Sequence, residues 1–277
     1  MIQLFPKLRS RMLLGLGIVL ALAAVLLILY PGASLLLPAA VVLLGAALVF
    51  FFGYTQAVTT HNNLLGVLYN RLDADSFVKA YEPLTEIRVR NPNVRLMVRL
   101  HLSNAYCALG RFDDAAALLS SIDTATGKKP EAQLLSRFAV VSNLCYFALQ
   151  KGDAGEAKRQ LDELTAVRKQ LEALQQQKPE KKRIAFSTAL NEQCYALLTG
   201  GKVDPDQLRT QVRSSSGHPL QQLSASLWVA RAYLARNKNS EAVKLLEQLV
   251  SLAPALHPGR AAAKLLDELP EEAKAKK

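Results

Sequence analysis

The sequence predicts an all-α protein in which a two-helix transmembrane hairpin precedes a solenoid of helical hairpins. Two observations support this. Between Met12 and Asn70 the chain has no Asp, Glu, Lys or Arg. Beyond Tyr54, apolar residues recur three and four positions apart among good helix formers, which is the spacing of a helix with one buried face. No segment alternates with period two for long, so we expect no β-sheet.

Two apolar runs, 12–30 and 34–54, lie in the charge-free stretch, separated by Pro31-Gly32-Ala33. A hydrocarbon core of about 30 Å is crossed by roughly 20 helical residues, and lipid offers the backbone no hydrogen-bond partner. Each run is therefore expected to be a transmembrane helix. Small residues let such helices pack closely, and we expect those of the two runs to form the hairpin interface: Gly15, Gly17, Gly45, Ala46 and Ala47. Neither run has a charge at mid-depth, so the hairpin is predicted to be an anchor and not a channel.

The basic N-terminal segment 1–11 predicts the topology. Lys7, Arg9 and Arg11 precede the first run, and basic residues next to a span stay in the cytoplasm. Two spans joined by a short uncharged connection return the chain to the side where it began. We therefore expect an integral membrane protein, of a bacterial plasma membrane, whose N-terminus and C-terminal domain are cytoplasmic. A cleaved signal peptide is the alternative for the first run, but the run is longer than a usual signal core and a second span follows at once.

The rest of the chain is moderately basic. The net charge is +11, and the three N-terminal basic residues leave about +8 on the remainder. Such a surface favours anionic lipid headgroups, and no motif of specific nucleic-acid binding accompanies it. The stretch 88–99, with four arginines, is the better candidate for headgroup contact, whereas the basic cluster 178–183 is expected to be a solvated loop. Three widely spaced cysteines, Cys107, Cys145 and Cys194, indicate reduced, buried thiols.

Beyond Tyr54 a pattern of helical pairs repeats. One copy has Leu102-Ser103, Tyr106, Gly110, Ala115 and Leu119; another has Val229-Ala230, Tyr233, Asn237, Ala242 and Leu246. The number of positions from Tyr106 to Ala115 equals the number from Tyr233 to Ala242. A third copy covers 144–164 without the aromatic residue. A degenerate copy nearer the membrane has Leu65-Gly66, Tyr69, Phe77 and Ala80, with a turn about two residues longer.

This pattern resembles the tetratricopeptide repeat (TPR). In that family a small residue lets two helices approach, an aromatic packs across them, Gly or Asn closes the turn, and an alanine lies at the closest contact. The resemblance covers roughly residues 61–254. It implies a TPR-like α-solenoid over 61–269, closed by a capping helix at 255–269, with a disordered tail at 270–277. An extended connection at 175–183 accounts for the irregular spacing of the copies.

The resemblance implies a protein or peptide partner held in a groove lined by the first helix of each pair. Asn104, Tyr146 and Arg231 occupy the same inner-face position in successive copies, and Ser142 lies one turn before Tyr146. Asn104 resembles the family's peptide-clamping asparagine, and Arg231 is suited to a carboxylate. The alternative is that these residues form a solvated concave surface without a partner.

The sequence contains no motif of catalysis. It has no phosphate-binding glycine loop after a strand, no nucleophile in a glycine turn and no histidine pair spaced for zinc. We therefore predict no enzyme activity, no cofactor and no metal. The predicted function is a membrane-anchored scaffold or adaptor that binds a protein partner at the cytoplasmic face. The alternative is a regulatory or assembly subunit of a larger membrane complex, with the spans bound to other spans.

Overall fold

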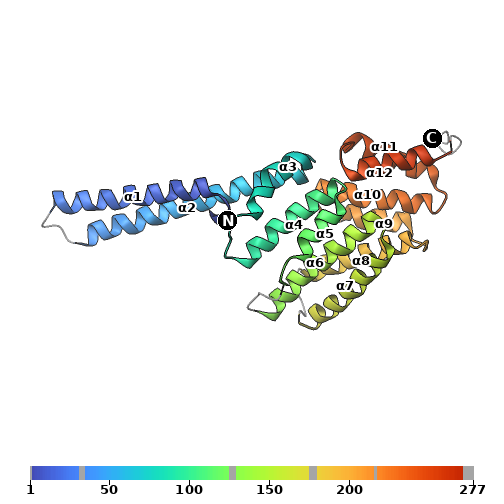
Figure 1. The fold of residues 1–277 in the computed structure, drawn as a ribbon, viewed down its shortest axis with the longest axis horizontal. Helices are drawn as coiled ribbons and strands as arrows, with labels where there is room; N and C mark the ends of the chain where they lie inside the picture. Colours follow the sequence, from blue (N-terminus) through green and yellow to red (C-terminus); the bar gives the residue numbers. More distant parts are fainter. Residues whose placement is uncertain (1, 31–34, 125–128, 175–179, 215–216, 271–277) are drawn as a thin grey trace.

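The computed structural model describes residues 2–30, 35–124, 129–174, 180–214 and 217–270, which contain helices and no β-strand. The fold class is therefore all-α, as predicted (Figure 1). Two short 3-10 helices, η1 (Ile2–Leu4) and η2 (Glu82–Thr85), accompany the α-helices. The α-helices are α1 (Pro6–Leu29), α2 (Leu36–Tyr69), α3 (Ala74–Tyr81), α4 (Pro92–Ala108), α5 (Phe112–Ser120), α6 (Pro130–Lys151), α7 (Ala154–Leu174), α8 (Glu180–Leu198), α9 (Pro205–Ser214), α10 (Pro219–Leu234), α11 (Asn239–Leu252) and α12 (His257–Glu268).

Helices α1 and α2 pack side by side as a long hairpin that projects from the rest of the molecule (Figure 1). Glycines let them approach: a Cβ added at Gly15 would lie 3.2 Å from a Val49 methyl, and one at Gly45 would lie 2.6 Å from a Val19 methyl. Gly15 and Gly45 are thus interface residues, as predicted. Gly17 faces open space, so its predicted place in the interface was wrong.

Helix α2 is longer than the second apolar run. It continues without a break from Leu36 to Tyr69, 34 residues and about 51 Å. The sequence indicated a span ending at residue 54 and a separate first helix of the solenoid beginning near 61. Within α2 no proline occurs after Pro38, and Gly66, the one glycine of α2 beyond residue 54, costs a helix only about 1 kcal/mol, so nothing interrupts the helix. The hairpin and the solenoid therefore share one helix.

Three of the described helices are long and apolar enough to cross a membrane: α1, α2 and α6. The surfaces of α1 and α2 differ from that of α6. Apart from Leu174 and Leu252, every large apolar side chain that is exposed in the described residues lies in the hairpin, between Leu13 and Tyr54. Helix α6 is instead enclosed by α4, α5, α7 and α8. Its apolar character is that of a core helix.

In the described residues, the solenoid consists of five helical pairs followed by α12. The first helices are α2 (from about residue 61), α4, α6, α8 and α10; the second helices are α3, α5, α7, α9 and α11. Tight turns separate the helices of a pair, and each of the five described turns contains a residue with positive φ: Leu72, Gly110, Gly152, Gly200 and Asn237. Successive helices are therefore antiparallel. The first helices run away from the hairpin and the second helices return (Figure 1).

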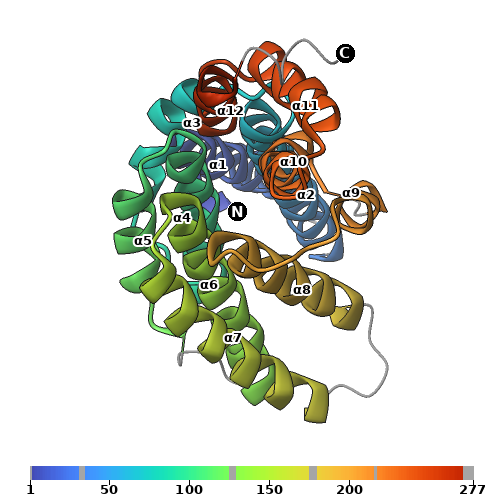
Figure 2. The same ribbon diagram turned by 90° about the vertical axis from the view of Figure 1, so that its right-hand side faces the viewer.

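The array closes on itself (Figure 2). Helix α10 contacts α2, and α12 contacts α4. The Arg260 guanidinium donates a hydrogen bond to the Leu109 carbonyl at 2.7 Å, and His257 packs edge-on against Phe112 at 4.8 Å between ring centroids. The predicted capping helix thus exists as α12, but it also joins the last pair to the turn of the second pair.

Most predicted packing positions are buried. Ala115, Ala157 and Ala242 are fully buried at the start of the second helices, and all three cysteines are buried and free. The degenerate first pair is the exception. Ala80 is exposed and Phe77 is fully buried in its place, because the turn is shorter than predicted and α3 begins already at Ala74.

Candidate functional site

The inner-face residues predicted from the sequence lie on the first helices but do not form one open surface. Asn104 lies between α4 and α2, where its amide donates a hydrogen bond to the Tyr69 hydroxyl at 3.1 Å. Ser142 lies between α6 and α8. Its hydroxyl is 2.6 Å from that of Ser187 and accepts a bond from the Asn191 amide at 3.3 Å. Both side chains therefore connect neighbouring pairs.

Tyr146 of α6 packs against both hydrophobic clusters of the solenoid. Its hydroxyl accepts a hydrogen bond from the Gln150 amide at 2.5 Å, and burial raises its pKa well above 10. The first helices thus meet through their inner-face side chains. Of the four predicted groove residues, three make contacts inside the fold.

Arg231 of α10 is placed differently, because it borders a pocket of about 440 Å³. The pocket lies at the C-terminal ends of α6, α8 and α10, the end of the solenoid away from the hairpin. Its walls include Gln150, Leu197, Leu198, Trp228, Arg231 and Leu265. The guanidinium lies 4.5 Å from the centre of the Trp228 ring. In the described residues no hydrogen bond or ion pair satisfies it, and burial lowers its pKa.

Two further polar groups of the pocket walls have no partner in the described structure. The Trp228 Nε1–H and the Gln150 Oε1 atom are buried and unbonded. A buried polar group without a partner costs about 1–3 kcal/mol, so such groups are candidates for ligand contact. Together with Arg231 they offer two donors and one acceptor within a mostly apolar wall. This arrangement suits a partner segment in which an apolar side chain fills the pocket and a neighbouring oxygen atom accepts a hydrogen bond from the Arg231 guanidinium.

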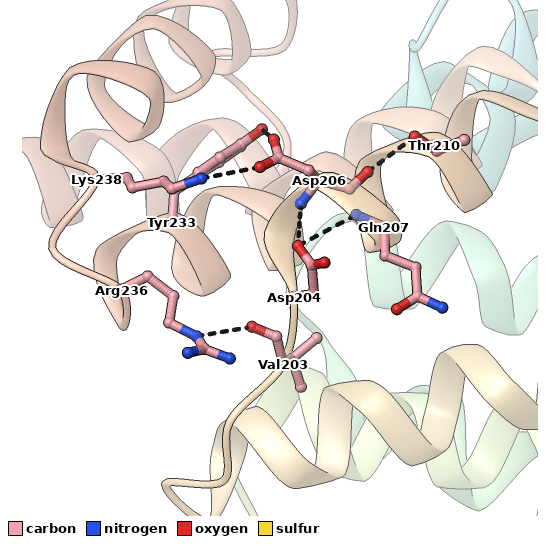
Figure 3. Close-up of polar contacts among 8 residues, drawn as sticks. All are labelled: Val203, Asp204, Asp206, Gln207, Thr210, Tyr233, Arg236 and Lys238. Carbon is pink, nitrogen blue, oxygen red and sulfur yellow. Dashed lines mark hydrogen bonds and ion pairs between the residues drawn. The ribbon is translucent and has the colours of Figure 1, made fainter.

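A polar joint connects the fourth pair to the fifth (Figure 3). The Tyr233 hydroxyl donates to Asp206 Oδ1 at 2.5 Å, and Lys238 Nζ donates to Asp206 Oδ2 at 2.9 Å. These bonds hold the Asp206 pKa below its usual value. Asp204 caps α9 by accepting from the backbone of Asp206 at 3.0 Å. A capping aspartate followed by Pro205 is a typical helix start in sequence, whereas no sequence pattern indicated the bonds between the pairs.

The same joint occurs between the first and second pairs. The Tyr106 hydroxyl donates to Glu82 Oε1 at 2.6 Å, and the Arg111 guanidinium lies 4.2 Å from the centre of the Tyr106 ring. Tyr106 and Tyr233 are the aromatic residues of the two best copies in sequence, and a basic residue follows each after five positions. Both aromatics therefore donate to a carboxylate of the preceding pair, which lies in η2 for Tyr106 and in α9 for Tyr233.

Residues 224–255, which contain Trp228, Tyr233 and Ala242, match the tetratricopeptide repeat family model. The solenoid is TPR-like. The match covers the fifth pair, and the other four share its helical arrangement. No curated protein matches the chain, and no solved structure matches it.

Tetratricopeptide repeats are typically protein-interaction modules without catalytic activity. Among the described residues, no group of three or more His, Cys, Asp or Glu side chains is arranged to hold a metal ion. Burial raises the pKa of the Cys107 and Cys194 thiols and raises that of Cys145 to about 12. These cysteines are therefore unreactive core residues.

Sequence reasoning missed a cluster of histidine and tyrosine side chains where the TPR-like solenoid closes. His101 of α4 and His218 before α10 pack against Tyr69, and His61 of α2 packs against His101. The Tyr69 hydroxyl lies 2.8 Å from His101 Nδ1. Burial lowers the pKa of His101 to about 4, with smaller contributions from His61 and His218. The three histidines are far apart in sequence, so no spacing rule indicated their proximity.

Proposed function

We propose that this protein is a membrane-anchored TPR-like scaffold or adaptor that holds a protein partner at the cytoplasmic face of the membrane. The main support is the exposed apolar surface of the hairpin, between Leu13 and Tyr54. Exposed patches of this size are not tolerated in water, and a lipid bilayer fits the length of the apolar part of each helix. Because α2 continues into the solenoid, such an anchor would hold an interaction module at the membrane surface.

The proposed site for the partner is the Arg231 pocket, which opens at the end of the solenoid away from the hairpin. A partner segment with an apolar side chain and a carboxylate or carbonyl oxygen would fill it. Asn104, Ser142 and Tyr146 would then act indirectly, by holding the first helices together. The second candidate, an assembly subunit of a larger membrane complex, is supported by the exposed apolar faces of α1 and α2, which would suit neighbouring helices equally well.

The anchor is tested by extraction and labelling. The full chain should stay with membranes in carbonate and in high salt. With the native cysteines buried, Lys244→Cys on the exposed face of α11 should be shielded from an impermeant thiol reagent in intact cells. Release by salt alone would contradict the anchor, and labelling of Lys244→Cys would contradict the cytoplasmic placement.

Partner binding is tested by photocrosslinking at three exposed positions. Ala235 borders the pocket, Ala166 lies on α7, and Leu43 lies on the hairpin. We expect a partner adduct from position 235 that is absent from 166 and is lost in Arg231→Met, with unchanged helicity. Adducts from position 43 but not from 235 would favour the assembly subunit instead.

A further inference from the structure

Acidic and basic residues are distributed differently at the two ends of the solenoid. Acidic residues occupy the first turn of every second helix: Asp75, Asp113, Asp114, Glu156, Asp206 and Glu241. Since the second helices begin away from the hairpin, these acids lie at the far end. At the near end, the sequence from Ile87 to Arg95 has no acid and contains Arg88, Arg90 and Arg95. The nearest carboxylate before them is Glu86, and Glu82 is bound by Tyr106.

The fold brings this arginine segment against the start of the chain. The Arg90 backbone N–H donates to the Gln3 side-chain oxygen at 3.4 Å, across 87 positions of sequence. Val89 and Leu4 are buried in the same hydrophobic cluster. Helix α1 then carries Lys7, Arg9 and Arg11. Two basic segments that are far apart in sequence, 7–11 and 88–95, therefore lie next to each other where the hairpin meets the solenoid.

Six side chains form this basic collar: Lys7, Arg9, Arg11, Arg88, Arg90 and Arg95. All six are exposed, and no carboxylate in the described residues forms an ion pair with any of them. Arg99, by contrast, donates to the Ser121 carbonyl and hydroxyl and is fixed within the solenoid. The collar side chains are not fixed within the solenoid in this way.

The position of the collar along the hairpin matches the edge of its apolar surface. Met12 packs against Gly53, so Lys7, Arg9 and Arg11 lie beside the part of α2 that follows Tyr54. Exposed large apolar side chains of α2 end at Tyr54. Gln3, which accepts a hydrogen bond from the Arg90 backbone, lies in η1, four residues before Lys7. Long arginine side chains extend along an apolar surface to reach an interface.

We propose that the basic collar binds the phosphate groups of anionic phospholipids in the leaflet from which the solenoid emerges. The inference rests on the proposed membrane anchoring and adds a lipid preference to it. Guanidinium groups bind phosphate through two parallel hydrogen bonds, and basic residues near an anionic membrane surface are attracted to it. The attraction of the collar to the membrane surface therefore orients the solenoid with its pocket away from the bilayer.

The test is a lipid titration of the full chain in detergent micelles, followed by native mass spectrometry. Wild type should bind phosphatidylglycerol in preference to phosphatidylcholine. Removal of two collar charges in R88Q/R90Q should weaken phosphatidylglycerol binding about tenfold or more. The control R71Q/K202Q removes two exposed charges from the far end and should bind as wild type does.

Flotation of the same proteins with liposomes separates the two proposals. A chain that does not float would overturn the anchor and the collar together. A chain that floats but binds both lipids equally, or an R88Q/R90Q variant that binds phosphatidylglycerol like wild type, would overturn the collar alone. Equal binding of soluble glycerol phosphate would identify a site for small anions and would also contradict the lipid proposal.

Discussion

Substitution of Gly259 by alanine should separate α12 from the rest of the solenoid. Gly259 is buried in the first turn of α12, against the C-terminal end of α11. An added Cβ would lie 2.6 Å from the Ala253 carbonyl carbon, closer still to its oxygen, and 3.2 Å from the Leu249 oxygen. Non-bonded heavy atoms prefer about 3.5 Å or more. These neighbours are backbone atoms, which no side-chain rotation can remove, so α12 would have to move by about 1 Å.

The expected cost follows from two opposing effects. Alanine in place of glycine favours a helix by up to about 1 kcal/mol. Overpacking against a rigid neighbour costs about 1–3 kcal/mol and occasionally more. The shift would also disturb Ala262, which is fully buried, and the bond from Arg260 to Leu109. We expect a net loss of about 2 kcal/mol, which corresponds to a fall in Tm of roughly 4–8 °C for a domain of this size.

Thermal unfolding of the full chain in detergent, followed by circular dichroism, measures this loss. Gly155→Ala is the matched control, because Gly155 also lies in the first turn of a helix but the nearest atom to an added Cβ is Asp153 Oδ1 at 3.6 Å. The control should be unchanged or slightly more stable. A Gly259→Ala protein as stable as the control would refute the docking of α12 and the closure of the array.

Two further predictions concern packing and acid stability. Ala242→Leu should destabilise the fold by about 1–3 kcal/mol because Ala242 is fully buried between two helices. Exposed Ala166→Leu should have little effect, and equal Tm values for the two variants would show that the repeat register is wrong. The pKa of His101 is lowered from 6.5 to about 4 in the folded chain. Between pH 6.5 and 4 the unfolded chain therefore binds more protons than the folded chain does. Stability should therefore fall by about 3 kcal/mol as the pH drops through that range, in denaturant titrations. His101→Gln should lose this part of the pH dependence; an unchanged profile would contradict the assignment.

Local sterics explain what the sequence could predict. A tight turn between antiparallel helices requires a residue that tolerates positive φ, and Gly110 and Asn237 supply it. Close helix approach requires a small side chain, which Ala115 and Ala242 supply. The first pair shows the limit of this reasoning. Its turn uses Leu72 at φ 61°, a residue that no turn rule favours, and the predicted position of Ala80 was therefore wrong.

Closure of the array could not be predicted in the same way. It depends on contacts such as that of Arg260 with Leu109, which are 151 positions apart and follow no repeat spacing. The contact of His218 with Tyr69 depends on the same closure. In an open superhelix, inner-face residues would face solvent. Here Asn104, Ser142 and Tyr146 contact neighbouring helices, so the inner-face position alone does not indicate accessibility.

The continuity of α2 has a mechanical consequence for the proposed anchor. A flexible linker would let an interaction domain tumble above a membrane, and its charge distribution would then average out. In this protein the helix that would leave the bilayer is also the first helix of the solenoid, and η1 packs against it through buried Leu4. The tilt of the hairpin therefore sets the orientation of the solenoid directly. Under the proposed anchoring, the basic collar stays at the membrane surface and the Arg231 pocket stays at the opposite end, accessible to a partner from the aqueous side.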